Sequence, residues 1–99
     1  MATDVPPEFY GLVDRFISRA NELTNDHHMS LVSAVFLFAA SRYNAHCMLA
    51  LDPNPRENRE AAVAYFVEQY RTMLQDNIDW LIASEEAEEG TERSDPAGR

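Results

Sequence analysis

Arg42 is the residue whose chemistry is hardest to reconcile with its neighbours in the sequence. It follows an apolar run, within the stretch "FLFAASRYNAHC" at residues 36–47, and on a helix it would share a face with Phe38 and Leu49. A guanidinium on an apolar face must either extend to solvent or find a carboxylate or carbonyl partner. We therefore expect Arg42 to have a polar partner elsewhere in the chain.

Asn77 is a second polar residue at a position that should face the core, because Met73 and Leu81 lie one turn before and after it. Asp14 lies at the edge of an apolar stripe and is the candidate carboxylate. We predict that Arg42, Asn77 and Asp14 form a structural polar core, inside a helical bundle or at its dimer face. Such polar sets are best known for fixing register and partner orientation.

An alternative groups Arg42, Tyr43, Asn44 and His46 around a core pocket, as in a small ligand-binding protein or enzyme. Catalysis requires a nucleophile with a base and an orienting group, or paired carboxylates in a cleft, and the sequence has no evident set of this kind. We therefore assign no catalytic residue and favour a protein that is not an enzyme. Cys47 has apolar neighbours on its helix face, which is typical of a small buried hydrophobic residue.

The segment "DHH", Asp26 to His28, is the one local cluster of potential metal ligands. Adjacent histidines in a short loop do not both face one ion without special backbone geometry. The three glycines form no phosphate-binding loop. We expect a solvated turn at Asp26, His27 and His28, and neither a metal nor another cofactor.

Three helices would position these residues, at about 7–25, 31–51 and 55–84. Ser30 is the expected N-cap of the second helix, and "LDPNP" should end it. The first and third helices each have one apolar stripe, whereas the second is apolar on almost all sides, as is typical of a central helix. We predict an all-α fold, a three-helix antiparallel bundle with a long third helix.

A single helical domain over residues 1–83 and a disordered acidic tail over residues 84–99 complete this prediction. The tail has six of the 17 acidic residues, and the whole chain has a formal net charge of −9. This charge disfavours nucleic acid and anionic membranes as partners. The longest apolar run is too short to span a bilayer, the start "MATDVPPEFY" is unlike a secretory signal, and there is one cysteine, so we expect a cytoplasmic protein.

The motifs "AASRYNA" at residues 39–45 and "YFVEQYRTML" at residues 65–74 resemble a family of small proteobacterial helical proteins of unknown function. The resemblance covers about residues 8–82, with "VDRFISRANEL" as a further match. It implies a bacterial, cytoplasmic, all-helical domain and implies no activity, substrate or catalytic residue.

The second helix has more apolar surface than two neighbouring helices cover, and the third ends with Trp80 and Ile82. We therefore favour a homodimer built by helix packing, which serves as a protein-interaction or adaptor module. A tetratricopeptide-like adaptor is a further alternative, because "ALDPNP" is similar to the turn between such repeats.

Overall fold

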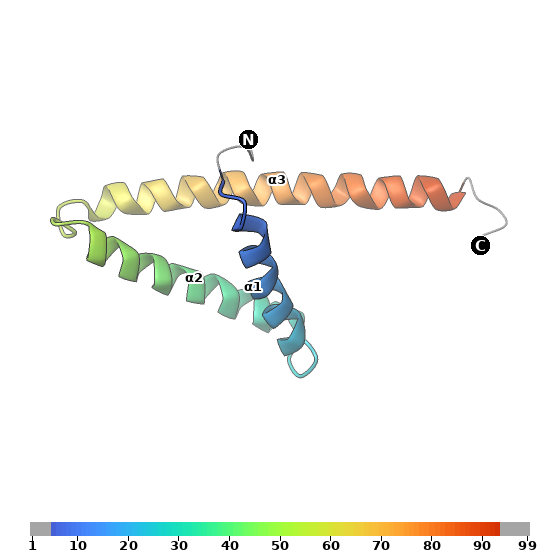
Figure 1. Cartoon of the computed structure of the whole chain (residues 1–99), viewed down its shortest axis with the longest axis horizontal. Coiled ribbons are helices and arrows are strands. Elements are labelled where there is room, and N and C mark those ends of the chain that lie inside the picture. Colours follow the sequence, from blue (N-terminus) through green and yellow to red (C-terminus); the bar gives the residue numbers. More distant parts are fainter. Residues whose placement is uncertain (1–4, 94–99) are drawn as a thin grey trace. The chain divides into compact units, whose positions relative to one another are not determined.

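The computed structural model describes the backbone of residues 5–93 and the side chains of residues 5–90. The described chain is all-α, with three helices and no strand: α1 (Phe9–Leu23), α2 (Met29–Leu51) and α3 (Arg59–Arg93) (Figure 1). The all-α prediction is confirmed. The chain divides into two compact units, residues 1–53 with α1 and α2, and residues 54–99 with α3.

The first unit is a helical hairpin whose loop is closed by backbone hydrogen bonds from the end of α1. The amides of Asp26 and His27 both donate to the carbonyl oxygen of Leu23, at 3.1 and 3.0 Å. From this loop α1 and α2 diverge (Figure 1). Val32, in the first turn of α2, is 7% exposed and is the buried hydrophobic residue of the described chain. The hairpin therefore buries apolar surface mainly near its loop.

The start of α2 differs from the predicted one, because the N-cap is His28 and not Ser30. The His28 backbone is extended, with φ −61° and ψ 143°, and its Nδ1 accepts a hydrogen bond from the Ser30 amide at 3.1 Å. The Ser30 hydroxyl lies 2.9 Å from the same ring nitrogen. Ser30 is thus inside the helix, in its first turn, and the imidazole takes the role that a serine or aspartate side chain usually has.

The second unit consists of α3 and the turn that precedes it. The predicted start at residue 55 is wrong, because residues 55–58 form a turn in which the Asn58 amide donates to the Asn54 carbonyl oxygen at 3.0 Å. The Asn58 carbonyl oxygen then accepts from the Ala62 amide at 2.9 Å. Pro55 restricts the residue before it to extended backbone, which delays the regular helix.

The end of α3 lies beyond the expected limit at residue 84, because the helix continues to Arg93. Residues 84–93, which we assigned to the tail, are therefore helical, and the rest of that predicted tail, residues 94–99, lies outside the described residues. Alanine and glutamate favour helix formation without tertiary contacts, which accounts for the extension. At 1.5 Å per residue, α3 is about 52 Å long. No helix within the described part is long and apolar enough to cross a membrane.

Candidate functional site

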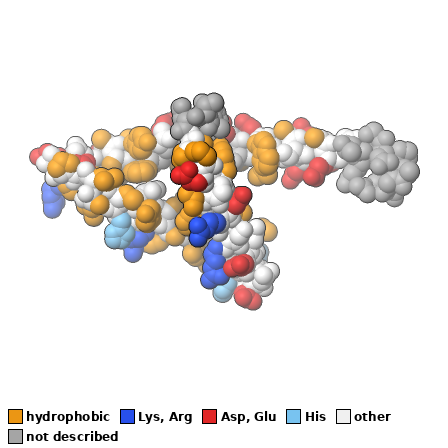
Figure 2. Space-filling model, viewed as in Figure 1, with side chains coloured by type: hydrophobic (Ala, Val, Ile, Leu, Met, Phe, Trp, Pro, Cys, Tyr) orange, Lys and Arg blue, Asp and Glu red, His pale blue; other side chains and the backbone are white. Residues whose placement is uncertain are grey.

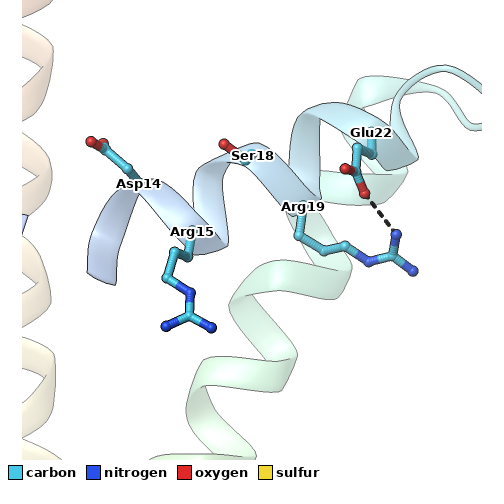
Figure 3. Close-up of a pocket in the computed structure, with 5 residues that line it drawn as sticks. All are labelled: Asp14, Arg15, Ser18, Arg19 and Glu22. Atoms are coloured by element: carbon cyan, nitrogen blue, oxygen red, sulfur yellow. Dashed lines mark hydrogen bonds and ion pairs between the residues drawn. The ribbon is translucent and has the colours of Figure 1, made fainter. Parts of the chain in front are cut away.

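The polar face of α1 forms a shallow pocket lined by Asp14, Arg15, Ser18, Arg19 and Glu22 (Figure 3). All five residues come from one helix, so the pocket is a groove between neighbouring side chains. Arg19 Nη1 donates to Glu22 Oε1 at 2.8 Å, and both side chains are about two-thirds exposed, at 69% and 65%. The Asp14 carboxylate and the Arg15 guanidinium extend in different directions (Figure 3). This arrangement is typical of the solvent face of an amphipathic helix.

Arg42 lies on α2 with its guanidinium carbon 5.1 Å from the centroid of the Phe38 ring, one turn earlier. A cation over an aromatic face is attracted by the ring quadrupole. Ser41 also contacts this turn, because its hydroxyl donates to the Phe38 carbonyl oxygen at 2.8 Å. In the described hairpin the contact of Arg42 is thus with an aromatic ring, and the polar partner that we expected for it stays a prediction.

The other two members of the predicted polar core lie on different helices. Asp14 belongs to the exposed face of α1, and Asn77 is an exposed residue of α3, in the second unit. No buried polar or charged residue occurs among the described ones. A network of Arg42, Asp14 and Asn77 therefore requires packing beyond the hairpin alone, and it stays a prediction.

The alternative cluster around Arg42 is confined to one stretch of α2. Asn44 is half-buried, whereas Arg42, Tyr43 and His46 are exposed. Successive residues of a helix point about 100° apart, so Arg42 and His46 share a side, while Asn44 points away from them. None of these residues lines the pocket on α1. Convergence of all four side chains on one small ligand is thus not favoured by the helix geometry.

Of the two loop histidines, only His28 has a structural role for its side chain. His28 caps α2 through its Nδ1 atom, whereas His27 contributes its backbone amide to the end of α1. In the part of the chain that the structure describes, no group of three histidine, cysteine or acidic side chains is placed to hold a metal ion. The cap was missed in the sequence because histidine is not among the residues that N-caps prefer. The position of His28 was a signal for the cap. It lies two residues before Ser30, and a side chain at this position reaches the second amide of the helix.

The main surface feature of both units is exposed apolar side chains. In α2, Leu31, Leu37 and Phe38 are 53%, 53% and 60% exposed. In α3, Trp80 and Ile82 are 65% and 50% exposed. Figure 2 shows hydrophobic side chains recurring along each helix. Cys47, a free thiol, is half-buried on α2.

No curated protein and no solved structure matches this chain. A family model described as a protein of unknown function, DUF3144, matches residues 9–82. This range includes all of α1 and α2, with the Phe38 and Arg42 turn, and α3 as far as Ile82. The matched range is 74 of the 99 residues, and the chain therefore belongs to the DUF3144 family of proteins of unknown function.

Proposed function

We propose that this chain is a homodimeric protein-interaction module whose subunits associate by helix packing. The observation that supports the proposal is the apolar surface of α2. Among the 23 residues of this helix, Arg42 is the one arginine, lysine, aspartate or glutamate, yet Val32 is the one buried residue. Soluble monomers rarely expose contiguous apolar surface of this extent unless another protein covers it.

Neighbouring helices of the same chain would not cover the whole apolar surface of α2. Leu31, Val35 and Phe38 lie on one side of α2, and Leu37 lies on another; these four side chains are at least 53% exposed. One helix covers one side of its neighbour, and the hairpin already buries a third side, that of Val32, so one more helix would still leave a side of α2 exposed. A second subunit is the simplest further cover, because two-fold homodimers are the commonest oligomers.

Arg42, Asp14 and Asn77 would set the register of this association. A guanidinium over Phe38 is 5.1 Å from the ring centroid and is available to a carboxylate or amide brought by packing. Polar residues at such positions select one partner orientation, because every other orientation leaves them unpaired. We also propose a cytoplasmic location and a second, different protein as the partner of the dimer, both on the sequence argument alone.

Light scattering over a range of micromolar concentrations tests the homodimer. The expected mass is twice the 11.3 kDa of the chain. The variant Arg42→Ala should dissociate at a higher protein concentration than wild type, because its dimer is weaker. The variant Arg15→Ala, on the polar face of α1, should dissociate at the same concentration as wild type. A monomeric mass for the wild type at every concentration contradicts the homodimer. Equal association of the two variants would remove only the register role of Arg42.

A further inference from the structure

One side of α3 has a continuous apolar stripe, which we call the α3 stripe. Its residues recur at steps of three and four, and all are between 37% and 53% exposed: Val63, Phe66, Val67, Tyr70, Met73, Leu74, Ile78 and Leu81. Asn77 is the polar residue within it. Such spacing places these side chains on one side of the helix, as in helices that pack against another helix.

The two ends of the α3 stripe have opposite charge. Arg59 precedes Val63 by four residues, and Glu85 follows Leu81 by four residues, so both lie on the side of the stripe. Thr72 is the midpoint, because Val63 and Leu81 are each nine residues from it, and Arg59 and Glu85 are each thirteen. Reversing the direction of the helix about Thr72 therefore exchanges the arginine with the glutamate.

The total charge of α3 is also uneven along its length. Before residue 75, Arg59 and Arg71 balance Glu60 and Glu68. From residue 75 to residue 90 there are six carboxylates and no basic residue: Asp76, Asp79, Glu85, Glu86, Glu88 and Glu89. Two parallel copies would bring both sets of six together, and like charges side by side are unfavourable. Two antiparallel copies keep the sets at opposite ends.

We propose that the α3 stripe binds the α3 stripe of a second copy of this chain in antiparallel orientation, centred on Thr72. This inference rests on the proposed homodimer and adds a contact surface on α3 to the one proposed on α2. Val63 then packs beside Leu81 of the partner subunit, and Arg59 lies beside Glu85 of the partner subunit. Arg59 is 69% exposed in its ion pair with the adjacent Glu60, and exposed pairs of this kind exchange partners at little cost.

Asn77 is the feature that would favour the parallel alternative. In a parallel pair the two Asn77 amides would face each other and could form a hydrogen bond, as asparagine does in parallel coiled coils. That one contact is opposed by the repulsion between two sets of six carboxylates and by the loss of both Arg59 to Glu85 contacts. The charge pattern therefore selects the antiparallel pair.

Distances between spin labels test the orientation directly. With Cys47→Ser to remove the native thiol, a single label is attached at Thr72→Cys or at Glu86→Cys, both on the side opposite the stripe. In the antiparallel dimer the two labels at position 72 should be about 25 Å apart, and the two at position 86 about 50 Å apart. Light scattering on the same samples reports the mass.

Each outcome of this measurement has a distinct meaning. A short distance at both positions indicates parallel pairing and overturns the inference. A long distance at position 72 in a sample with dimeric mass also overturns it, because the dimer then forms through another surface. A monomeric mass contradicts the homodimer itself, and so the failure of the proposed function is distinguished from the failure of this inference.

Charge reversal tests the pairing of the stripe ends. Glu85→Arg should weaken the dimer about tenfold relative to Glu86→Arg, which has the same net charge but lies on the opposite side of α3. Adding Arg59→Glu to Glu85→Arg should restore the affinity, because the two pairs are re-formed with reversed signs. Equal affinities for Glu85→Arg and Glu86→Arg would overturn the proposed register.

Discussion

The helix α2 and the last part of α3, residues 84–93, are both helical but differ in almost every other property. Arg42 is the one arginine, lysine, aspartate or glutamate of α2, whereas four glutamates occur from Glu85 to Glu89 in α3. The comparison shows that the two segments are helical for different reasons. From its composition, α2 depends on packing of its apolar sides, whereas the end of α3 depends on local backbone preference.

Composition explains the difference. The β-branched and aromatic residues of α2, such as Val35, Phe36 and Phe38, lose side-chain freedom in a helix and favour it only weakly. Such a segment needs its apolar sides covered. The segment from Ala83 to Glu89 consists almost wholly of alanine and glutamate, both good helix formers. It needs no apolar contact, although its neighbouring carboxylates repel each other.

The largest expected effect is that of a charge at the buried position of α2. Val32→Asp should destabilise the hairpin by about 3 kcal/mol, because an unpaired carboxylate is placed where the native side chain is 7% exposed. Val35→Asp, at a position 53% exposed, should leave the hairpin folded and weaken self-association. Thermal melts followed by circular dichroism, with light scattering, separate the two effects. If both variants lose the same free energy of unfolding, burial of Val32 near the loop is not what stabilises α2 in the hairpin.

A smaller effect is expected at the N-cap of α2. His28→Ala removes the acceptor of the Ser30 amide and should cost about 1 kcal/mol of unfolding free energy. His27→Ala removes an imidazole from the neighbouring position, where the backbone amide makes the hydrogen bond to Leu23. This variant should lose less free energy of unfolding. Urea denaturation of both variants measures the difference. Equal losses would show that the imidazole of His28 does not act as a cap.

The end of α3 should respond to helix propensity alone. Gly90→Ala should stabilise the last turns by about 0.5 to 1 kcal/mol, because the added methyl group meets no heavy atom within 4 Å. Hydrogen exchange at the amides of residues 85–93 should slow accordingly. Gly11→Ala in α1, where the space is also open, is the control and should slow exchange in the hairpin only. If Gly90→Ala leaves hydrogen exchange at the end of α3 unchanged, local helix preference is not what stabilises this segment.

The smallest effect is expected for the ion pair of Arg71 and Glu68 on α3. Their Nε and Oε1 atoms are 3.3 Å apart, and the side chains are 60% and 66% exposed. A double-mutant cycle with Arg71→Gln and Glu68→Gln should give a coupling of about 0.3 kcal/mol that disappears at high salt. A coupling several times larger would indicate that this face of α3 is covered in solution.

Much of the fold could be predicted from apolar periodicity and helix-ending residues. The turn at Pro53 and Pro55 and the three helices follow from them, and the end of α2 at Leu51 agrees with the structure. The ends that depend on weaker signals could not be predicted. The His28 cap depends on one side-chain rotamer, and the continuation of α3 to Arg93 depends on a balance between helix preference and charge repulsion.

The candidate site was predictable only as a set of residue types. Arg42 stands out from its apolar neighbours in the sequence, but its contact with Phe38 appears only in the structure. Asp14 belongs to the polar face of α1 together with Arg15 and Glu22. An arrangement of this kind depends on which side of each helix another helix covers, and local periodicity does not contain that information.

The sequence by itself determined the all-α class and the apolar stripes, because helix preference, proline and the three-to-four residue spacing act locally. It also determined the charge pattern along α3. Only the tertiary structure decided that Val32 is the apolar side chain buried by the hairpin and that Leu31 and Phe38 are left exposed. Burial depends on the angle at which two helices meet, and that angle results from the loop and the packed side chains together.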